Sequence, residues 1–339
     1  MQTFATKKKE LFPDATSRRI FGLIKREMGL VEDEFERQAQ SNIQVISYLG
    51  DYLRASGGKR VRPALLILSS YAVGGRGDAD PVIRLATVME MLHTATLVHD
   101  DIIDNADLRR NRSSINSRFG NQTAVLMGDW LYMSAFETSL RERSLAILDI
   151  LTKLTRKMTE GELIQLTMLG NLSITRAEYF DILERKTAYL FAGCSEIGAI
   201  LAGAGRDEQT AMREYGMNLG IAFQLADDLL DITAEREALG KAAGADLLEG
   251  KVTLPLITLI ERDPALKVVL EEVLLSGMFS AEVKDRLNDA MLEHNVIDEV
   301  RKVAAGYAEA ARKSLDVFPK SEYRTALDEI PSFVIGRSS

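Results

Sequence analysis

Apolar residues recur every three or four positions along most of this 339-residue chain, and no stretch shows the period of two that a half-buried strand needs. The first such pattern runs from Ser17 to Phe35. Only seven prolines occur, and helix-forming residues are common throughout. The periodicity predicts further helices over residues 43–53, 63–71, 81–104, 123–140, 147–169, 176–201, 207–232 and 254–260, with weaker patterns over 271–317. The expected fold class is therefore all-α.

The breaks between these patterns are short and rich in glycine, as in Gly74-Gly75-Arg76-Gly77 and Gly203-Ala204-Gly205. No long Ser/Pro/Gly linker divides the chain, and no period of 20 to 50 residues indicates a solenoid. We therefore expect a single domain over residues 1–339.

Charge and cysteine content exclude several classes of function. The net charge is −8, so the chain lacks the basic field that binds nucleic acid or anionic lipid without specificity. Glu90 and Glu196 interrupt the longest apolar stretches, which are too short to span a bilayer. The single cysteine, Cys194, excludes a disulfide framework and a multi-thiolate zinc site. A reducing, cytoplasmic setting is expected.

The pentapeptide pattern DDxxD occurs twice, each time on an expected helix. The two copies are Asp100-Asp101-Ile102-Ile103-Asp104 and Asp227-Asp228-Leu229-Leu230-Asp231. Residues i and i+4 share a helix face, so the outer carboxylates of each motif would converge. A solvated acidic face is the alternative, but apolar residues flank both motifs. Half-buried acid clusters need a counter-charge, and hard divalent cations with oxygen ligands supply one. Two facing clusters would hold a phosphorylated ligand between them.

Basic residues accompany both motifs. Gly57-Gly58-Lys59-Arg60-Val61-Arg62-Pro63 is a glycine-hinged turn that opens a helix, where anions bind readily. A P-loop is rejected because no Ser or Thr follows Lys59 and no strand precedes it. Arg109-Arg110 follows the first motif, although pairing of one arginine with Asp107 is an open alternative. Lys186-Thr187 lies within a helix, and Lys241 and Lys251 bracket a glycine-rich loop that contains Asp246.

The chain has three histidines, of which His93 lies two helical turns before Asp100 on the same face. It could hydrogen-bond a second diphosphate, or be a satisfied core histidine. The pair His99-Asp100 is similar to the HD pair of metal-dependent phosphohydrolases, but the further spaced histidines of that site are lacking. No local signature of a covalent nucleophile is present.

Together these motifs resemble the trans-isoprenyl diphosphate synthases, also called polyprenyl synthetases. The match runs over a core of residues 57–255 and includes GGKRVRP, the His93 helix, DDIID with Arg109-Arg110, GDWLY near Asp129, Gly161-Glu162 with Gln165, Lys186-Thr187, and Phe223-Gln224 before DDLLD. One departure is Asn111-Arg112, where the family commonly has Gly after the two arginines. The resemblance implies an antiparallel helical bundle around a deep central cavity, the isoprenoid synthase type I fold, working as a homodimer.

The resemblance also implies a reaction, the head-to-tail condensation of isopentenyl diphosphate with an allylic diphosphate (dimethylallyl, geranyl or farnesyl). Asp100, Asp101, Asp104, Asp227, Asp228 and Asp231 would bind two to three Mg²⁺ ions. Arg109, Lys186, Thr187, Gln224 and Lys241 would hold the allylic diphosphate, and Lys59, Arg62, His93 and Arg110 the isopentenyl diphosphate. Lys251 would also bind substrate. Ionisation of the C–O bond would leave a cation that the isopentenyl double bond attacks, and the released pyrophosphate would accept the proton.

Product length in the family resembles a ruler set by side chains below the first motif. Here Ala95 and Thr96 are small, with Leu92 a turn deeper, which favours a long-chain product. Met127, Trp130 and Leu131 on the facing helix could close the pocket lower down, or be ordinary core residues. The alternatives to a long-chain synthase are a farnesyl or geranylgeranyl diphosphate synthase, a non-catalytic subunit and a class I terpene cyclase.

Overall fold

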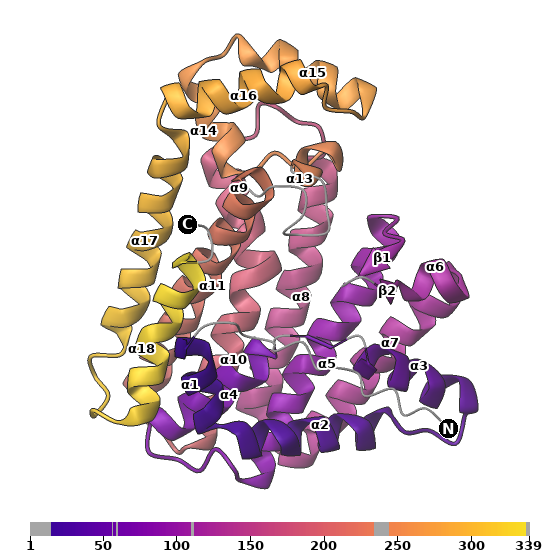
Figure 1. Cartoon of the computed structure of the whole chain (residues 1–339). Helices are drawn as coiled ribbons and strands as arrows, with labels where there is room; N and C mark the ends of the chain where they lie inside the picture. Colours follow the sequence, from indigo (N-terminus) through magenta and orange to yellow (C-terminus); the bar gives the residue numbers. More distant parts are fainter. Residues whose placement is uncertain (1–14, 56, 59, 110–111, 234–243, 337–339) are drawn as a thin grey trace, which may run out of the picture.

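The computed structural model describes residues 15–55, 57–58, 60–109, 112–233 and 244–336. Within these ranges the chain is almost entirely helical (Figure 1), which confirms the all-α prediction. The first helices are α1 (Ala15–Leu23), α2 (Lys25–Ala39), α3 (Gln44–Ala55), α4 (Val61–Ala72) and α5 (Asp80–Ile103). The middle of the chain forms α6 (Ile115–Phe119), α7 (Asn121–Ser139), α8 (Leu145–Thr167), α9 (Arg176–Leu183), α10 (Tyr189–Leu201) and α11 (Arg206–Thr233). The last helices are α13 (Ala245–Leu248), α14 (Leu254–Arg262), α15 (Leu266–Ser276), α16 (Ala281–Glu293), α17 (Val296–Ser314) and α18 (Glu322–Ile335).

The long helices stand side by side as a bundle (Figure 1). α10 packs on α4 and α11, α11 packs on α17, and α5 packs along α7. α15 and α16 lie across the upper end of the bundle, and α2 lies across its lower end. None of the helices described here is both long and apolar enough to cross a membrane.

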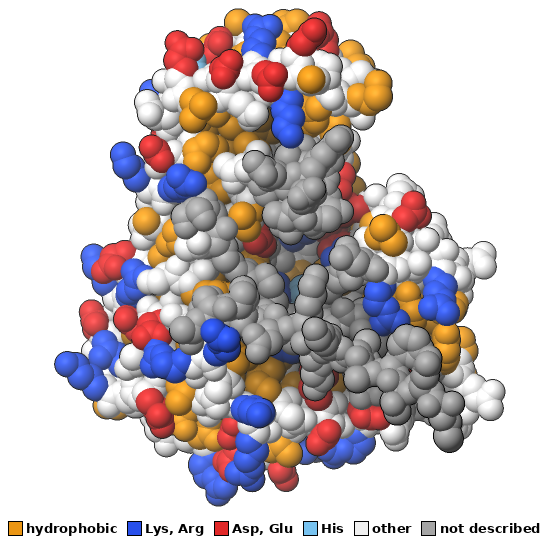
Figure 2. Space-filling model, in the orientation of Figure 1, with side chains coloured by type: hydrophobic (Ala, Val, Ile, Leu, Met, Phe, Trp, Pro, Cys, Tyr) orange, Lys and Arg blue, Asp and Glu red, His pale blue; other side chains and the backbone are white. Residues whose placement is uncertain are grey.

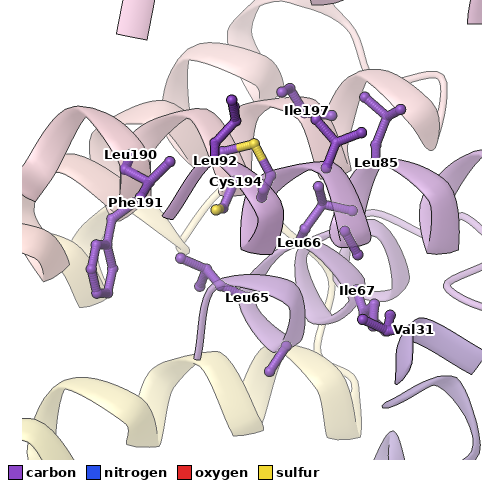
Figure 3. Close-up of a cluster of buried hydrophobic side chains, with 14 of the residues drawn as sticks. Val31, Leu65, Leu66, Ile67, Leu85, Leu92, Leu190, Phe191, Cys194 and Ile197 are labelled. Carbon is purple, nitrogen blue, oxygen red and sulfur yellow. The ribbon is translucent and has the colours of Figure 1, made fainter. Parts of the chain in front are cut away.

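The hydrophobic core is centred on α4, whose residues Leu65, Leu66, Ile67 and Leu68 are all fully buried. A helix that is apolar all round is stable only when neighbours cover every side. Figure 3 shows Leu65 and Leu66 beside Phe191 and Cys194 of α10. A second cluster of buried apolar residues includes side chains of α9, α11, α14, α15, α16 and α17.

The structure differs from the predicted elements in several places. The continuous helix expected over 176–201 is interrupted by a π-helical turn over Glu184–Ala188, here called the π-turn. The first amphipathic pattern forms two helices, because Ile24 leaves helical geometry between α1 and α2. α18 was not predicted, although Ala326, Leu327 and Ile330 are buried at helical spacing within it. A short antiparallel hairpin of β1 (Leu108–Arg109) and β2 (Arg112–Ser113) is too brief to show alternation.

Candidate active site

A cavity of about 660 Å³ lies among α4, α5, α7, α8, the π-turn, α10 and α11. The hollow in the middle of the face in Figure 2 shows acidic side chains and a histidine at its bottom. Its polar wall includes Arg62, His93, Asp100, Lys186, Gln224 and Asp227. Its apolar wall is formed by Val61, Leu97, Ile103, Met158, Leu190 and Phe223. The two acidic motifs, although far apart in sequence, therefore share one cavity with basic groups.

The first acidic motif ends α5. Asp100 lines the cavity, and burial, reinforced by the Glu162 and Asp104 carboxylates against the opposing effect of Lys186, raises the pKa of Asp100 to about 6. Asp104 caps the helix, and its Oδ1 accepts a hydrogen bond from Lys251 Nζ at 3.2 Å. Asp101 is buried and lines a small separate cavity.

Asp101 accepts a hydrogen bond at 2.6 Å from Arg109 Nε. Of the two arginines considered as partners of Asp107, Arg109 pairs with Asp101, and Arg110 lies outside the described residues. Arg109 is thereby held beside the motif at the start of the hairpin.

The second motif lies on α11, and, as in the first motif, one carboxylate lines the cavity while its neighbour is buried. Asp227 lines the cavity, whereas Asp228 is buried and accepts hydrogen bonds from Tyr179 Oη at 2.5 Å and from Gln224 Nε2 at 2.9 Å. Burial and the nearby Asp246 carboxylate raise the pKa of Asp228. Burial also holds the pKa of Tyr179 well above its ordinary value, so the phenol remains a donor.

The third carboxylate of this motif, Asp231, has a structural contact of its own. Its Oδ2 accepts a hydrogen bond at 3.2 Å from the backbone N–H of Asp246, in the first turn of α13. An acidic group at a helix N-terminus satisfies an otherwise orphaned donor. The second motif therefore also anchors the start of α13 to the end of α11.

The π-turn carries Lys186 and Thr187 into the cavity. Lys186 Nζ lies 2.6 Å from Glu162 Oε2 and donates to Gln165 Oε1 at 2.7 Å, and Thr187 Oγ1 donates to Gln224 Oε1 at 2.9 Å. A smaller cavity of about 150 Å³ shares Lys186, Thr187 and Gln224 with the first and extends to Asp228 and Lys251. Single π-turns are frequent at functional sites.

The glycine-hinged turn and the start of α4 contribute two arginines, Arg60 and Arg62, with different contacts. Arg62 lines the cavity, with its guanidinium 5.1 Å from the centre of the Phe191 ring. Arg60 has a left-handed backbone, with φ of 50°, and is nearly buried. Its Nε donates to Glu32 at 2.6 Å, and its Nη1 donates to Glu90 at 2.7 Å. Arg60 therefore anchors the turn to α2 and α5.

Several expected site residues are placed elsewhere or not described. Lys59, Arg110 and Lys241 lie outside the described residues. Of the expected chain-length positions, Thr96 lines the cavity. Leu92, Ala95, Met127 and Leu131 are buried in the core, and Trp130 packs partly exposed against the same core. In Figure 3 Leu92 lies beside Cys194.

The sequence did not predict a role for the residues that position other side chains of the site. Glu162 and Gln165 were recognisable as family matches but carried no role, and Tyr179 gave no signal. Among the described residues, no three carboxylate, histidine or cysteine side chains come close enough to hold a metal ion by themselves. That is compatible with Mg²⁺, which binds through one or two carboxylates and completes its shell with water and substrate phosphates.

Comparison with known proteins identifies relatives over most of the chain. The polyprenyl synthetase family model matches residues 43–291. An octaprenyl diphosphate synthase of Haemophilus influenzae is 36% identical over 92% of this chain and 94% of its own length. A geranylgeranyl diphosphate synthase of Methanosarcina mazei is 36% identical over 84% of this chain and 88% of its own length.

A solved structure is similar in fold as well as sequence. It is a polyprenyl synthase from Caulobacter crescentus in complex with calcium and isoprenyl diphosphate, with a TM-score of 0.88, 37% identity, and coverage of 95% of this chain and 98% of that one. The resemblance inferred from the motifs and the isoprenoid synthase fold are both confirmed, and this chain belongs to the polyprenyl synthetase family.

Proposed function

We propose that this chain is a trans-polyprenyl diphosphate synthase that condenses isopentenyl diphosphate with an allylic diphosphate and releases pyrophosphate. The observation that carries the proposal is the convergence of Asp100 and Asp227 on one apolar-walled cavity that also contains Arg62, His93 and Lys186. Carboxylates, cations and apolar walls together suit a ligand with a diphosphate head and a hydrocarbon tail.

The carboxylates fit divalent metal ions. Asp100 is a half-buried acid whose raised pKa reflects insufficient compensation of its charge, which a cation would supply. We assign Asp100, Asp104 and Asp227 to the metal ions. We assign Asp101 and Asp228, which are buried, and Asp231, which accepts from the backbone of α13, to positioning. Mg²⁺, in two to three ions, would neutralise the diphosphate as its charge grows.

Residues of the chain account for the other steps. Lys186 and Lys251 stabilise the negative charge that develops on the leaving pyrophosphate oxygen. Arg62 and His93 hold the isopentenyl diphosphate so that its double bond faces the allylic carbon. Leu97, Met158 and Phe223 exclude water, which would otherwise trap the allylic cation. The departing pyrophosphate accepts the proton lost after the new C–C bond forms.

A long-chain product is the first choice. The octaprenyl diphosphate synthase relative and the small Thr96 on the cavity wall support it. A geranylgeranyl-length product is the second candidate, favoured by the relative of that activity and by the burial of Leu92 and Ala95 in the core.

We further propose a cytoplasmic homodimer. Exposed apolar side chains on α7 support the dimer, namely Val125 (42% exposed), Leu126 (68%) and Met133 (63%). A reducing compartment suits the single, buried cysteine.

The test is incubation of the purified chain with Mg²⁺, labelled isopentenyl diphosphate and farnesyl diphosphate, followed by chromatographic sizing of the dephosphorylated products. A ladder that ends at a long polyprenol supports the long-chain assignment, and termination after one addition supports the geranylgeranyl alternative. EDTA should abolish incorporation, and excess Mg²⁺ should restore it. Absence of incorporation with Mg²⁺ present would overturn the proposal.

A further inference from the structure

The ammonium of Lys186 is held by two side chains of α8. Its Nζ lies 2.6 Å from Glu162 Oε2 and 2.7 Å from Gln165 Oε1. An ammonium has three N–H donors, and these contacts use two of them. The third N–H of the Lys186 ammonium is the one that would donate to a ligand in the cavity. The direction of that donor is therefore set by where α8 places Glu162 and Gln165.

A glycine sets the distance between α8 and the π-turn. At Gly161 an added Cβ would lie 2.7 Å from Arg185 Cβ and 2.9 Å from the backbone N of Lys186. Real Cβ atoms do not approach a backbone nitrogen that closely, so any larger residue would move the π-turn away from α8. The close approach at Gly161 is what brings the next residue, Glu162, within salt-bridge distance of Lys186.

The Glu162 carboxylate lies at the cavity wall, where it can affect the reaction as well as the packing of α8 on the π-turn. Its side chain is 15% exposed, and Glu162 lines the cavity together with Lys186 and Asp100. A salt bridge at the cavity wall holds the lysine side chain in one conformation before the ligand arrives. Such pre-organisation removes the cost of ordering a long side chain during catalysis.

We infer that Glu162 is a positioning residue that aims Lys186 at the allylic diphosphate, with Gly161 setting the spacing that makes this possible. The inference rests on the proposed synthase activity and assigns to Glu162 no contact with the reacting atoms. The π-turn, Gly161 and the Glu162 carboxylate then act together to orient Lys186.

The first test is Glu162→Gln, which keeps the shape and one acceptor but removes the charge. Loss of a hydrogen bond to a charged group corresponds to about a 10- to 100-fold effect. We expect kcat/KM for the allylic diphosphate to fall by that factor, KM for isopentenyl diphosphate to change less than about twofold, and product length to stay the same. The melting temperature should be retained.

Glu160→Gln is a matched control. Glu160 lies on the same helix, and its Oε2 accepts from Arg185 of the same π-turn at 2.5 Å, but it has no recorded contact with Lys186. If Glu162 acts only by packing α8 on the π-turn, both variants should lose the same activity. If it aims Lys186, only Glu162→Gln should be impaired.

A double variant gives the decisive readout. If Glu162 acts through Lys186, combining Glu162→Gln with Lys186→Met should reduce kcat/KM no further, within about twofold, than Lys186→Met alone. Fully multiplicative losses would overturn the inference. Gly161→Ala should reproduce the kinetic defect of Glu162→Gln, and normal kinetics in a folded Gly161→Ala protein would also contradict it.

These outcomes are separable from failure of the synthase assignment. A wild-type protein that incorporates no isopentenyl diphosphate would refute the proposed function. An active wild type together with an equally active Glu162→Gln variant would refute this inference alone.

Discussion

The aspartates within each DDxxD motif have different environments. Asp100 and Asp227 line the cavity, whereas the middle residues, Asp101 and Asp228, are buried against protein donors. Neighbouring residues of a helix point about 100° apart, so only part of a five-residue motif can face one cavity. The side chains that face away hold Arg109 and Tyr179. The motif therefore combines ligand binding with local positioning.

Asp100→Asn should abolish turnover without harming the fold. The pKa of Asp100 is raised from 3.8 to about 6, so its carboxyl binds protons more tightly in the folded than in the unfolded state. Its ionisation therefore lowers stability as pH rises from about 4 to about 6. In EDTA at neutral pH, the Asn variant should melt at the same or a higher temperature, measured by differential scanning fluorimetry. A melting temperature lower by roughly 10 °C would instead show a structural role.

At the scale of elements, glycines determine how closely α10 and α11 approach. A Cβ at Gly216 would lie 2.4 Å from Phe191 O and 2.7 Å from Ala192 Cα. A Cβ at Gly220 would lie 2.6 Å from Ala188 Cα, at the end of the π-turn that precedes α10. Because the obstructing atoms are mostly backbone, they cannot yield as a flexible side chain would. This contact joins the helix of the second motif to the helix that follows the π-turn.

Gly216→Ala should therefore destabilise the protein by about 1–3 kcal/mol, as expected for overpacking. Gly306→Ala is the control, because a Cβ at Gly306 in α17 meets nothing within 4 Å. It should stabilise by about 0.5–1 kcal/mol through its higher helix propensity. Urea unfolding followed by circular dichroism measures both. Equal effects of the two substitutions would contradict the close approach of α10 and α11.

At the scale of the whole molecule, the cavity and the exposed face of α7 result from how the bundle is assembled. α5 packs along α7, so one side of α7 is buried on α5 while Leu126 and Met133 remain exposed. Other side chains of α5, including His93, Thr96 and Asp100, line the cavity. One helix pair thus connects the proposed subunit interface with the proposed substrate site.

Met133→Asp tests the proposed dimer. A charge in an apolar interface is costly when it has no partner, so the variant should sediment as a monomer where the wild type sediments as a dimer. Glu137→Asp, on the same helix, is a conservative control. A monomeric wild type, or a Met133→Asp protein that remains dimeric, would argue against an interface at α7. Analytical ultracentrifugation distinguishes these states.

Thr96→Phe tests which wall limits the product. Because Thr96 lines the cavity, the phenylalanine ring should fill space that the growing hydrocarbon tail needs. The product should become shorter by one or more isoprene units while the first condensation is retained. The measurement is chromatographic sizing of the dephosphorylated products. Ala95→Phe is the comparison, since Ala95 is fully buried and the ring would overpack the core. Unchanged length in Thr96→Phe would place the limit elsewhere.

The sequence alone determined the fold class, the two acidic motifs and the family. Helical periodicity and the i, i+4 spacing of the outer aspartates within each DDxxD motif are local properties, which a segment of sequence shows independently of its tertiary neighbours. It also indicated Lys186 and Arg62 as anion ligands. The full extent of one domain over residues 1–339 stays a prediction.

Only the tertiary structure decided which of these side chains meet. The pairing of Lys186 with Glu162, of Arg60 with Glu32 and Glu90, and of Asp228 with Tyr179 joins helices that are distant in sequence. Periodicity assigns a residue to a face of its own helix but does not say which other helix covers that face. Helix packing settles that question, and with it the shape of the cavity.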